Sequence, residues 1–149
     1  MKITVVAVGK IRDDSAGLCR EYLKRLKGVV VTEVAVAKSL PVIAAQNAEA
    51  AMILKALPSK TFVIVCDERG KDLSSREFAA QLTNWQGHSS NLTFVIGGAD
   101  GVTDEVRGRA QFLLGFGRKT WPHRLARVML LEQLYRAQQI NAGHPYHRD

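Results

Sequence analysis

The sequence lacks the features that mark secreted, membrane-spanning and zinc-binding proteins. Its 149 residues include only two cysteines, Cys19 and Cys66, without C-x-x-C spacing, which argues against a disulfide framework and a cysteine zinc site. No apolar run reaches the length of a membrane span or of a signal-peptide core. None of the four histidines falls in H-E-x-x-H spacing. We therefore expect a cytoplasmic chain with no membrane segment and no metal.

Two nucleotide-binding motifs are also missing. The dinucleotide fingerprint G-x-G-x-x-G and the P-loop G-x-x-x-x-G-K-[ST] do not occur, which disfavours NAD and ATP sites of the usual kinds. No repeat, linker or low-complexity segment interrupts the chain. With 46% hydrophobic residues it is long enough for one ordinary core, so residues 1–149 are expected to form a single domain.

Acidic residues are scarce relative to basic ones. Lysine and arginine number 21 against 14 aspartates and glutamates, a formal net charge of +7. A positive surface attracts polyanions and speeds their encounter, so nucleic acid is the favoured partner class. A soluble protein that is merely basic would show the same balance.

Short apolar, β-branched runs alternate along the chain with segments of helical periodicity. The predicted strands are Ile3–Val8, Val29–Val36, Thr61–Cys66, Leu92–Ile96 and Phe112–Phe116. The predicted helices begin at residues 13–15, span Pro41–Leu57, begin at Ser74 or Ser75, and span Thr103–Arg109 and Pro122–Ile140. This alternation predicts an α/β fold with a mainly parallel sheet covered by helices on both faces.

The last predicted helix is apolar around more than half of its circumference. Its apolar residues are Leu125, Val128, Met129, Leu130, Leu131, Leu134, Tyr135 and Ile140. A helix that packs only on its own sheet needs a narrower apolar stripe. Two explanations stay open: a second buried face that forms a dimer contact, or a helix wedged deep inside one subunit.

Ligands of open α/β sheets bind beyond the carboxyl ends of the strands, so the segments after the strands are the candidate sites. Three segments stand out: C-D-E-R-G-K from Cys66, G-G-A-D-G from Gly97, and F-G-R-K-T-W-P-H from Phe116. Glycines allow a sharp turn and leave main-chain groups free to bond a closely approaching ligand. A tight turn with no ligand would use the same residues.

Basic and aromatic side chains gather near the end of the chain. The basic ones around the last strand and helix are Arg118, Lys119, Arg124, Arg127 and Arg136. Arginines clamp phosphates and stack on bases, so this region is a candidate RNA-facing surface, with a solvated helix face as the alternative. The terminal H-P-Y-H-R from His144 offers a stacking ring, an imidazole and a guanidinium; a disordered tail or a weak histidine metal pair are the other readings.

The loops, the T-W-P-H sequence, the helix segment L-L-E-Q-L-Y-R-A and the final H-P-Y-H-R together resemble the RlmH family of SPOUT methyltransferases. The resemblance runs from V-A-V-G-K of the first strand to the last residues and is loosest between Val29 and Leu57. It implies S-adenosylmethionine as cofactor and N3 of a pseudouridine in large-subunit ribosomal RNA as methyl acceptor. It also implies a C-terminal trefoil knot, a homodimer and the mature ribosome as substrate.

The resemblance also assigns site residues. Those expected at the cofactor are Cys66, Gly97, Phe116, Gly117, Arg118, Lys119, Thr120 and Trp121. Family members more often have leucine in place of Cys66 and a smaller apolar residue in place of Trp121. From side-chain chemistry and the tail resemblance, His147 is the candidate base, Arg127 or Arg148 the charge stabiliser, and Tyr146 the group that stacks on the acceptor. No metal is required.

Two other functions remain compatible with the residues themselves. A non-catalytic, basic RNA-binding or ribosome-associated protein of the same fold would bind RNA but not the cofactor. An enzyme that uses a nucleotide cofactor on a small metabolite would not interact with ribosomes, and the missing phosphate-binding motifs disfavour it.

Overall fold

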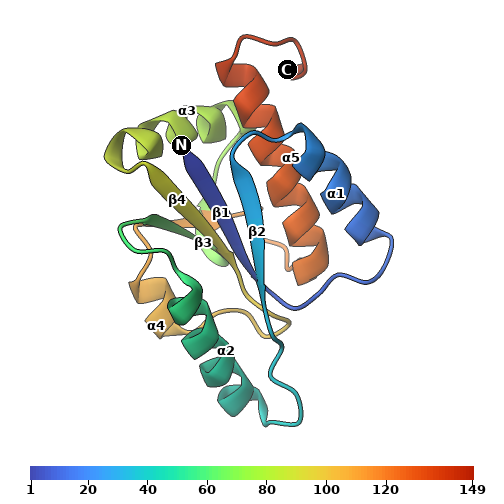
Figure 1. Ribbon diagram of the computed structural model, residues 1–149, viewed down its shortest axis with the longest axis vertical. Helices are drawn as coiled ribbons and strands as arrows, with labels where there is room; N and C mark the ends of the chain where they lie inside the picture. Colours follow the sequence, from blue (N-terminus) through green and yellow to red (C-terminus); the bar gives the residue numbers. More distant parts are fainter.

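A five-stranded parallel sheet lies between two layers of helices. The computed structural model describes residues 1–149, and its strands are ordered β2-β1-β4-β3-β5 (Figure 1). The strands are β1 (Lys2–Val8), β2 (Val29–Val34), β3 (Phe62–Asp72), β4 (Asn91–Ile96) and β5 (Phe112–Gly115). The helices are α1 (Ser15–Arg25), α2 (Val42–Ala56), α3 (Ser75–His88), α4 (Asp104–Gly108) and α5 (His123–Asn141). The predicted α/β class and parallel sheet are confirmed.

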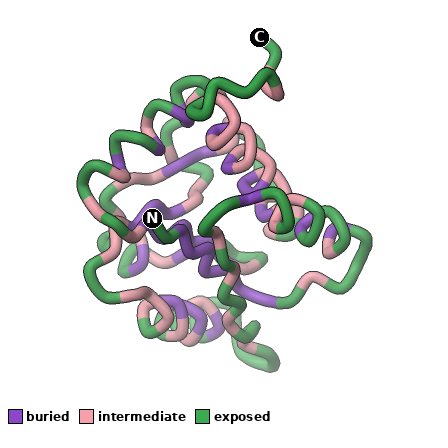
Figure 2. The backbone as a smooth tube through the Cα atoms, turned by 45° about the horizontal axis from the view of Figure 1, so that its top comes forward, coloured by how far each residue is buried: buried purple, intermediate pink, exposed green.

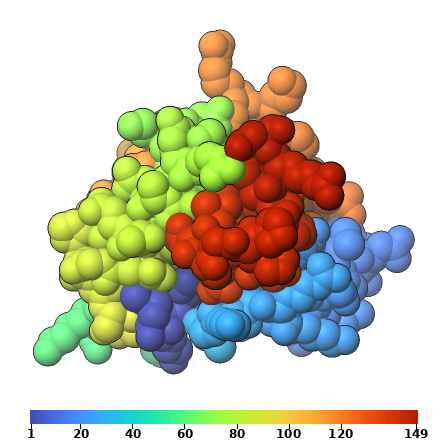
Figure 3. Space-filling model, turned by 90° about the horizontal axis from the view of Figure 1, so that it is seen from above, coloured from blue at the N-terminus to red at the C-terminus, as the bar shows by residue number.

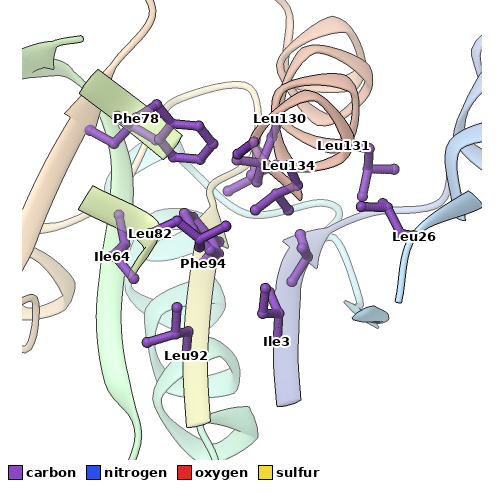
Figure 4. Packing of buried hydrophobic residues seen from close by; sticks show 14 of the residues in the cluster. Ile3, Leu26, Ile64, Phe78, Leu82, Leu92, Phe94, Leu130, Leu131 and Leu134 are labelled. Atoms are coloured by element: carbon purple, nitrogen blue, oxygen red, sulfur yellow. The ribbon is translucent and has the colours of Figure 1, made fainter. Parts of the chain in front are cut away.

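The alternation of side chains along each strand produces two separate cores. Ile3, Val5 and Ala7 of β1 face the layer of α1, α3 and α5, whereas Val6 and Val8 face α2 and α4. Figure 4 shows the larger core, in which leucines of α5 meet aromatic and aliphatic side chains from α3 and the sheet. In Figure 2 the central strands are buried along most of their length, as expected for a sheet covered on both faces.

The broad apolar surface of α5 is explained largely within one chain. The helix packs between α1 and α3 on the sheet, and Leu130, Leu131 and Leu134 are fully buried. A helix with neighbours on three sides needs a wide apolar face. Packing inside one subunit therefore accounts for these three leucines, and the dimer-contact explanation remains for the partly exposed Val128, Met129 and Tyr135. None of the five helices is long and apolar enough to cross a membrane.

Three strands, β2, β3 and β5, end elsewhere than the sequence predicts. β3 continues past Cys66 to Asp72, because after an irregularity Lys71 and Asp72 again pair with β5. Gly70 permits this pairing, since a Cβ there would lie 2.4 Å from the carbonyl carbon of Leu114. β2 ends at Val34 rather than Val36. Within α2, Ile43 is 73% exposed, because the helix packs through Ala45, Glu49, Ala50 and Ile53.

The carboxyl ends of four strands lie side by side at one edge of the sheet. Ala7 of β1 pairs with Ile96 of β4, Ile96 pairs with Cys66 of β3, and Cys66 pairs with Leu114 of β5. The segments that follow these residues therefore start from neighbouring points. This edge is where the three segments singled out from the sequence are expected to meet.

Candidate functional site

A cavity of about 400 Å³ opens at this edge of the sheet. Three segments form it: residues 66–68 after the first part of β3, residues 96–102 after β4, and residues 116–121 after β5. Arg107 of α4 and His123 and Ala126 from the first turn of α5 complete the wall. Its size lies within the range of cofactor and small-molecule pockets. The structure thus brings together all three segments that the sequence indicated.

The glycine segment forms one wall of the cavity as a tight turn. The amide of Gly101 donates to the carbonyl of Gly98 at 3.0 Å, and Gly101 has a left-handed backbone with φ +78°. A Cβ on Gly97 would lie 2.8 Å from Val102 Cγ1 and 2.9 Å from the carbonyl carbon of Gly101. Alanine at Gly97 would therefore force the turn open. The glycines are therefore required for the turn itself, and the outer surface of the turn lines the cavity.

Two acidic side chains on the cavity wall are held by hydrogen bonds from neighbouring elements. Arg107 bonds the buried carboxylate of Asp67 and, at 2.8 Å, the exposed carboxylate of Asp104. Thr120 donates its hydroxyl to Glu68 at 3.2 Å, which ties the segment after β5 to the segment after Cys66. These pairs hold three elements around the cavity. No cluster of three or more metal-ligating side chains is present.

The thiol of Cys66 lines the cavity as a neutral group. Burial raises the pKa of this thiol to about 12, and the neighbouring carboxylate of Asp67 adds to the shift. A thiol with so high a pKa is neither a nucleophile nor a base near neutral pH. Cys66 therefore contributes apolar wall to the cavity.

The structure brings seven of the eight predicted cofactor residues to the cavity. Those that line it are Cys66, Gly97, Phe116, Gly117, Lys119, Thr120 and Trp121, whereas Arg118 is exposed and does not. Phe116 lies beyond β5, which ends at Gly115 rather than at the predicted Phe116. Its release from the strand lets its carbonyl accept a hydrogen bond from the Trp121 indole at 3.0 Å. That bond closes residues 116–121 into a compact loop.

Arg127 does not line this cavity. Its side chain is only 5% exposed; it donates to Glu33 Oε2 at 2.6 Å and to the carbonyl oxygen of Gly9 at 2.8 Å. Its Nε is buried without a partner. Arg127 thus joins α5 to the carboxyl ends of β1 and β2. The expected role as a stabiliser of charge on the acceptor does not suit a guanidinium held in this way.

The C-terminal tail docks on α5 and α3, away from the cavity. Tyr146 donates to Glu132 at 3.2 Å, and His147 lies between Arg136 and Asp149 at 3.0 and 3.1 Å. Arg76 of α3 forms two bonds of 2.7 Å with Asp149, and Figure 3 shows the tail against α3. The disordered-tail alternative does not describe this arrangement. Figure 1 places the C-terminus at the end of α5 remote from the carboxyl ends of the strands.

The basic cluster predicted from the sequence divides into two groups. Arg118, Lys119 and Arg124 are exposed near the cavity, and Arg124 also pairs with Asp13. Arg136 is half-buried and bonded to Glu132, and the hydrogen bond with that carboxylate raises the pKa of the Arg136 guanidinium. Arg127 and Arg136 thus belong to the interior packing of α5. Only the first group faces solvent at the site.

Sequence reasoning missed three residues of the site. Arg107 of α4 and Ala126 of α5 line the cavity but lie outside the segments that stood out in the sequence. Glu49 of α2 is buried behind the glycine turn, where its carboxylate accepts a bond from the Ala37 amide at 3.2 Å. His123 also lines the cavity; the T-W-P-H segment contained it, but no role was attached to it.

A second cavity, of about 390 Å³, lies beside α5. It is lined mostly by apolar side chains of α1, α3 and α5 and by the turn after β3, among them Tyr22, Leu73, Phe78, Val128 and Met129. Phe116 lines both cavities, and Glu132 connects the second cavity to the docked tail. The two sites are therefore neighbours on the same side of the molecule.

Comparison with known proteins assigns the family. A family model described as predicted SPOUT methyltransferase matches residues 1–147. The chain is 46% identical to ribosomal RNA large subunit methyltransferase H of Rhodospirillum centenum, with 99% of each chain covered. It is 42% identical to the protein of the same name from Paracoccus denitrificans, with 100% of each chain covered.

A solved structure shares the fold. The structure of a probable methylase family protein from Haemophilus influenzae Rd KW20 superposes with a TM-score of 0.58 at 17% identity, covering 99% of this chain and 70% of that one. The family model and the full-length relatives confirm the resemblance seen in the sequence motifs. The chain belongs to the SPOUT methyltransferase family.

Proposed function

We propose that this protein transfers a methyl group from S-adenosylmethionine to a base of large-subunit ribosomal RNA. The observation that carries the proposal is the cavity formed by the glycine turn and residues 116–121, in a chain whose full-length relatives bear the name ribosomal RNA large subunit methyltransferase H. The family resemblance supports the finer proposal that the acceptor is N3 of a pseudouridine in the assembled ribosome.

The residues of the cavity suit S-adenosylmethionine. The cofactor supplies an activated methyl group on a sulfonium. Apolar side chains from Ile96, Val102, Phe116 and Trp121 offer a wall for an adenine ring, and the glycine turn leaves main-chain groups for hydrogen bonds. Lys119 is exposed on the cavity wall and would meet a carboxylate of the ligand. We propose that Cys66, Gly97 and residues 116–121, with Arg118 at the rim, hold the cofactor.

The family further implies a knotted chain. We propose that the segment after β5 is threaded to form the trefoil knot before α5 begins. The close passage of two backbones supports this topology: a Cβ on Gly115 would lie 2.6 Å from the carbonyl oxygen of Gly70. Knots are rare among folds, and no periodicity in the sequence would indicate one.

We propose that the working unit is a homodimer in which the tail of one subunit reaches the cavity of the other. Within one chain Tyr146 bonds Glu132, which lies nine residues, or about 13 Å, beyond His123 along α5. No residue of the docked tail lines the cavity of its own chain. The half-buried apolar cavity beside α5 offers a surface for a second copy. His147 would then hold the tail in shape between Arg136 and Asp149.

Exposed cations around the cavity would contact the RNA backbone. Arg118, Lys119 and Arg124 lie near it, and Lys10 follows β1 at the same edge of the sheet. Arginine and lysine at such a rim neutralise phosphates and give binding that weakens as salt increases. Residues 1–149 form one sheet with its helices, and the exposed cations at the cavity rim are few. We therefore propose that the dimer and the ribosome surface create the recognition site together.

The test is calorimetric titration with S-adenosylmethionine followed by a methylation assay on mature ribosomes and on protein-free ribosomal RNA. We expect saturable cofactor binding and transfer of labelled methyl groups to ribosomes, with free RNA a poor acceptor. RNA binding without cofactor binding would favour the non-catalytic alternative. Sedimentation analysis completes the test, because a monomer at working concentration would contradict the shared site.

A further inference from the structure

We infer that His123 is the group in the cavity that takes the proton from the acceptor nitrogen, in place of His147 of the tail. The inference rests on the proposed function and adds a catalytic residue to it. Methylation of a ring nitrogen that carries hydrogen requires that the proton leave, and a base near its own pKa performs this step best. Imidazole is the side chain that titrates in the physiological range.

His123 stands at the start of α5 and lines the cavity. Its Nε2 lies 3.8 Å from the position that a Cβ on Gly9 would occupy, so the glycine leaves space beside the ring. One helical turn further on, Arg127 lies on the same side of α5 and bonds the carbonyl oxygen of Gly9 at 2.8 Å. The buried guanidinium thus fixes the first turn of α5 against the end of β1. Arg127 is a positioning residue for His123.

The ring of His123 is free to accept a proton. No hydrogen bond joins the His123 ring to the rest of the chain. The two arginines near it on α5 are bound to other groups: Arg124 pairs with Asp13, and Arg127 bonds Glu33 and the carbonyl of Gly9. The other titratable or charged groups that share the cavity are Cys66, Asp67, Glu68, Asp100, Arg107 and Lys119.

None of those groups suits the step as well. Asp67 is bonded by Arg107, and Glu68 accepts the hydroxyl of Thr120. Asp100 is exposed, and a carboxylate in water is a weak base. Cys66 is a neutral thiol near neutral pH, because burial raises its pKa to about 12. His123 is the remaining proton acceptor on the wall.

His147 is occupied by the tail that holds it. An arginine always donates, so Nδ1 of His147 must accept from Arg136 Nη1 at 3.0 Å. The ring proton then lies on Nε2, which donates to Asp149 Oδ1 at 3.1 Å. Both nitrogens are therefore used, and no lone pair remains for a proton from RNA.

The proposed step moves one proton to His123 and one methyl group to the acceptor nitrogen. The N–H bond of the acceptor ring breaks and its proton moves to the free nitrogen of the His123 imidazole. The ring nitrogen, now with its electron pair available, bonds the methyl carbon while the carbon–sulfur bond breaks and its pair stays on sulfur. The imidazolium afterwards returns the proton to water. No oxidant, reductant or metal takes part.

The decisive experiment measures methylation of ribosomes against pH for the full-length protein and His123→Gln, with His88→Gln as the matched control on the far end of α3. In the wild type and the control, kcat should rise with pH to a plateau as the catalytic base loses its proton. In His123→Gln, kcat should fall about 100-fold and lose that inflection. Its Kd for S-adenosylmethionine, measured by calorimetry, should change by less than about threefold.

A second variant and a spectroscopic measurement guard against misfolding as the cause. Imidazole added to His123→Ala should restore part of the lost activity, which a structural defect would not allow. In nitrogen-15 spectra of the cofactor-free protein, His147 should carry its proton on Nε2, and cofactor binding should shift the His123 signals alone among the ring signals.

Failure of the proposed function and failure of this inference would give different results. A wild type that binds S-adenosylmethionine but does not methylate ribosomes overturns the proposed function, and this inference with it. A wild type that methylates while His123→Gln keeps its kcat and its pH inflection overturns this inference only. Loss of the inflection in His147→Gln, with His123→Gln unaffected, would return the role to the tail.

Discussion

The two ends of α5 hold the same pair of residue types, an arginine and a histidine, and use them in opposite ways. At the cavity end, Arg127 is buried and bonded to the chain, while His123 faces open space. At the tail end, Arg136 is half-exposed and bonds His147, whose ring has no free nitrogen. The comparison shows that side-chain chemistry alone does not identify a catalytic group. What matters is which lone pairs and protons the fold leaves free.

Replacing each arginine by methionine should break the comparison most strongly. Arg127→Met leaves the buried Gly9 carbonyl without a partner and removes a guanidinium that is only 5% exposed, and we expect a loss of about 3 kcal/mol in the free energy of unfolding. Arg136→Met should lose about 1 kcal/mol, because the Arg136 side chain is more exposed, at 24%, and its ion pair with Glu132 is worth less. Urea denaturation measures both. Equal losses in the free energy of unfolding would mean that the two arginines contribute equally to stability.

Two glycine-to-alanine variants, one at the cavity and one beyond the tail end of α5, should differ in their effect on cofactor binding. In Gly97→Ala the new Cβ would meet Val102 and the Gly101 backbone, and we expect Kd for S-adenosylmethionine to rise about 30-fold, or about 2 kcal/mol. Gly143→Ala, beyond α5, meets no atom within 4 Å but has φ +72°, so it should cost stability and leave Kd unchanged. Calorimetry gives the two constants. Unchanged affinity in Gly97→Ala would remove the glycine turn from the proposed site.

The layers of this fold were predictable because they depend on local patterns. The continuous apolar run Ile3–Val8 indicates a strand buried on both faces, and the helical spacing in α5 indicates a face that must be buried. Apart from the order of the strands, the architecture follows from such patterns. The positions of the glycine turn and the loop from Phe116 were predictable for a related reason, since strands of a parallel sheet end at one edge.

The partners of polar side chains were not predictable. Arg127 bonds residues 94 and 118 positions away in the chain, and no spacing rule reaches so far. The same holds for the tail, where Asp149 meets Arg76. An arginine in a basic stretch indicates an RNA surface unless a distant carboxylate binds it. For that reason the sequence pointed to the tail histidine and left the one at the cavity without a role.

The thiol in the cavity provides a test that depends on pH. In the folded state burial raises the pKa of Cys66 to about 12, whereas the ordinary pKa of the thiol, as in the unfolded chain, is 9.0. Between these values the unfolded chain binds fewer protons, so the stability due to this group is complete below pH 9 and is lost as pH rises toward 12. Relative to Cys66→Leu, the wild type should lose about 1.4 kcal/mol by pH 10. Denaturation at pH 8 and pH 10 measures the difference, and a gap that does not change with pH would contradict a buried neutral thiol.

The tail end of α5 should show the smallest effect. Burial, followed by the nearby Glu132, raises the pKa of the Tyr146 hydroxyl, which donates to that carboxylate at 3.2 Å. Tyr146→Phe removes this bond but keeps the ring, which packs edge-on against Tyr135 with ring centres 4.8 Å apart. The free energy of unfolding should therefore fall by less than about 1 kcal/mol, and Kd for S-adenosylmethionine should not change. If kcat on ribosomes nevertheless falls, the hydroxyl acts on the acceptor in a partner's cavity. If kcat is also unchanged, Tyr146 serves only to dock the tail.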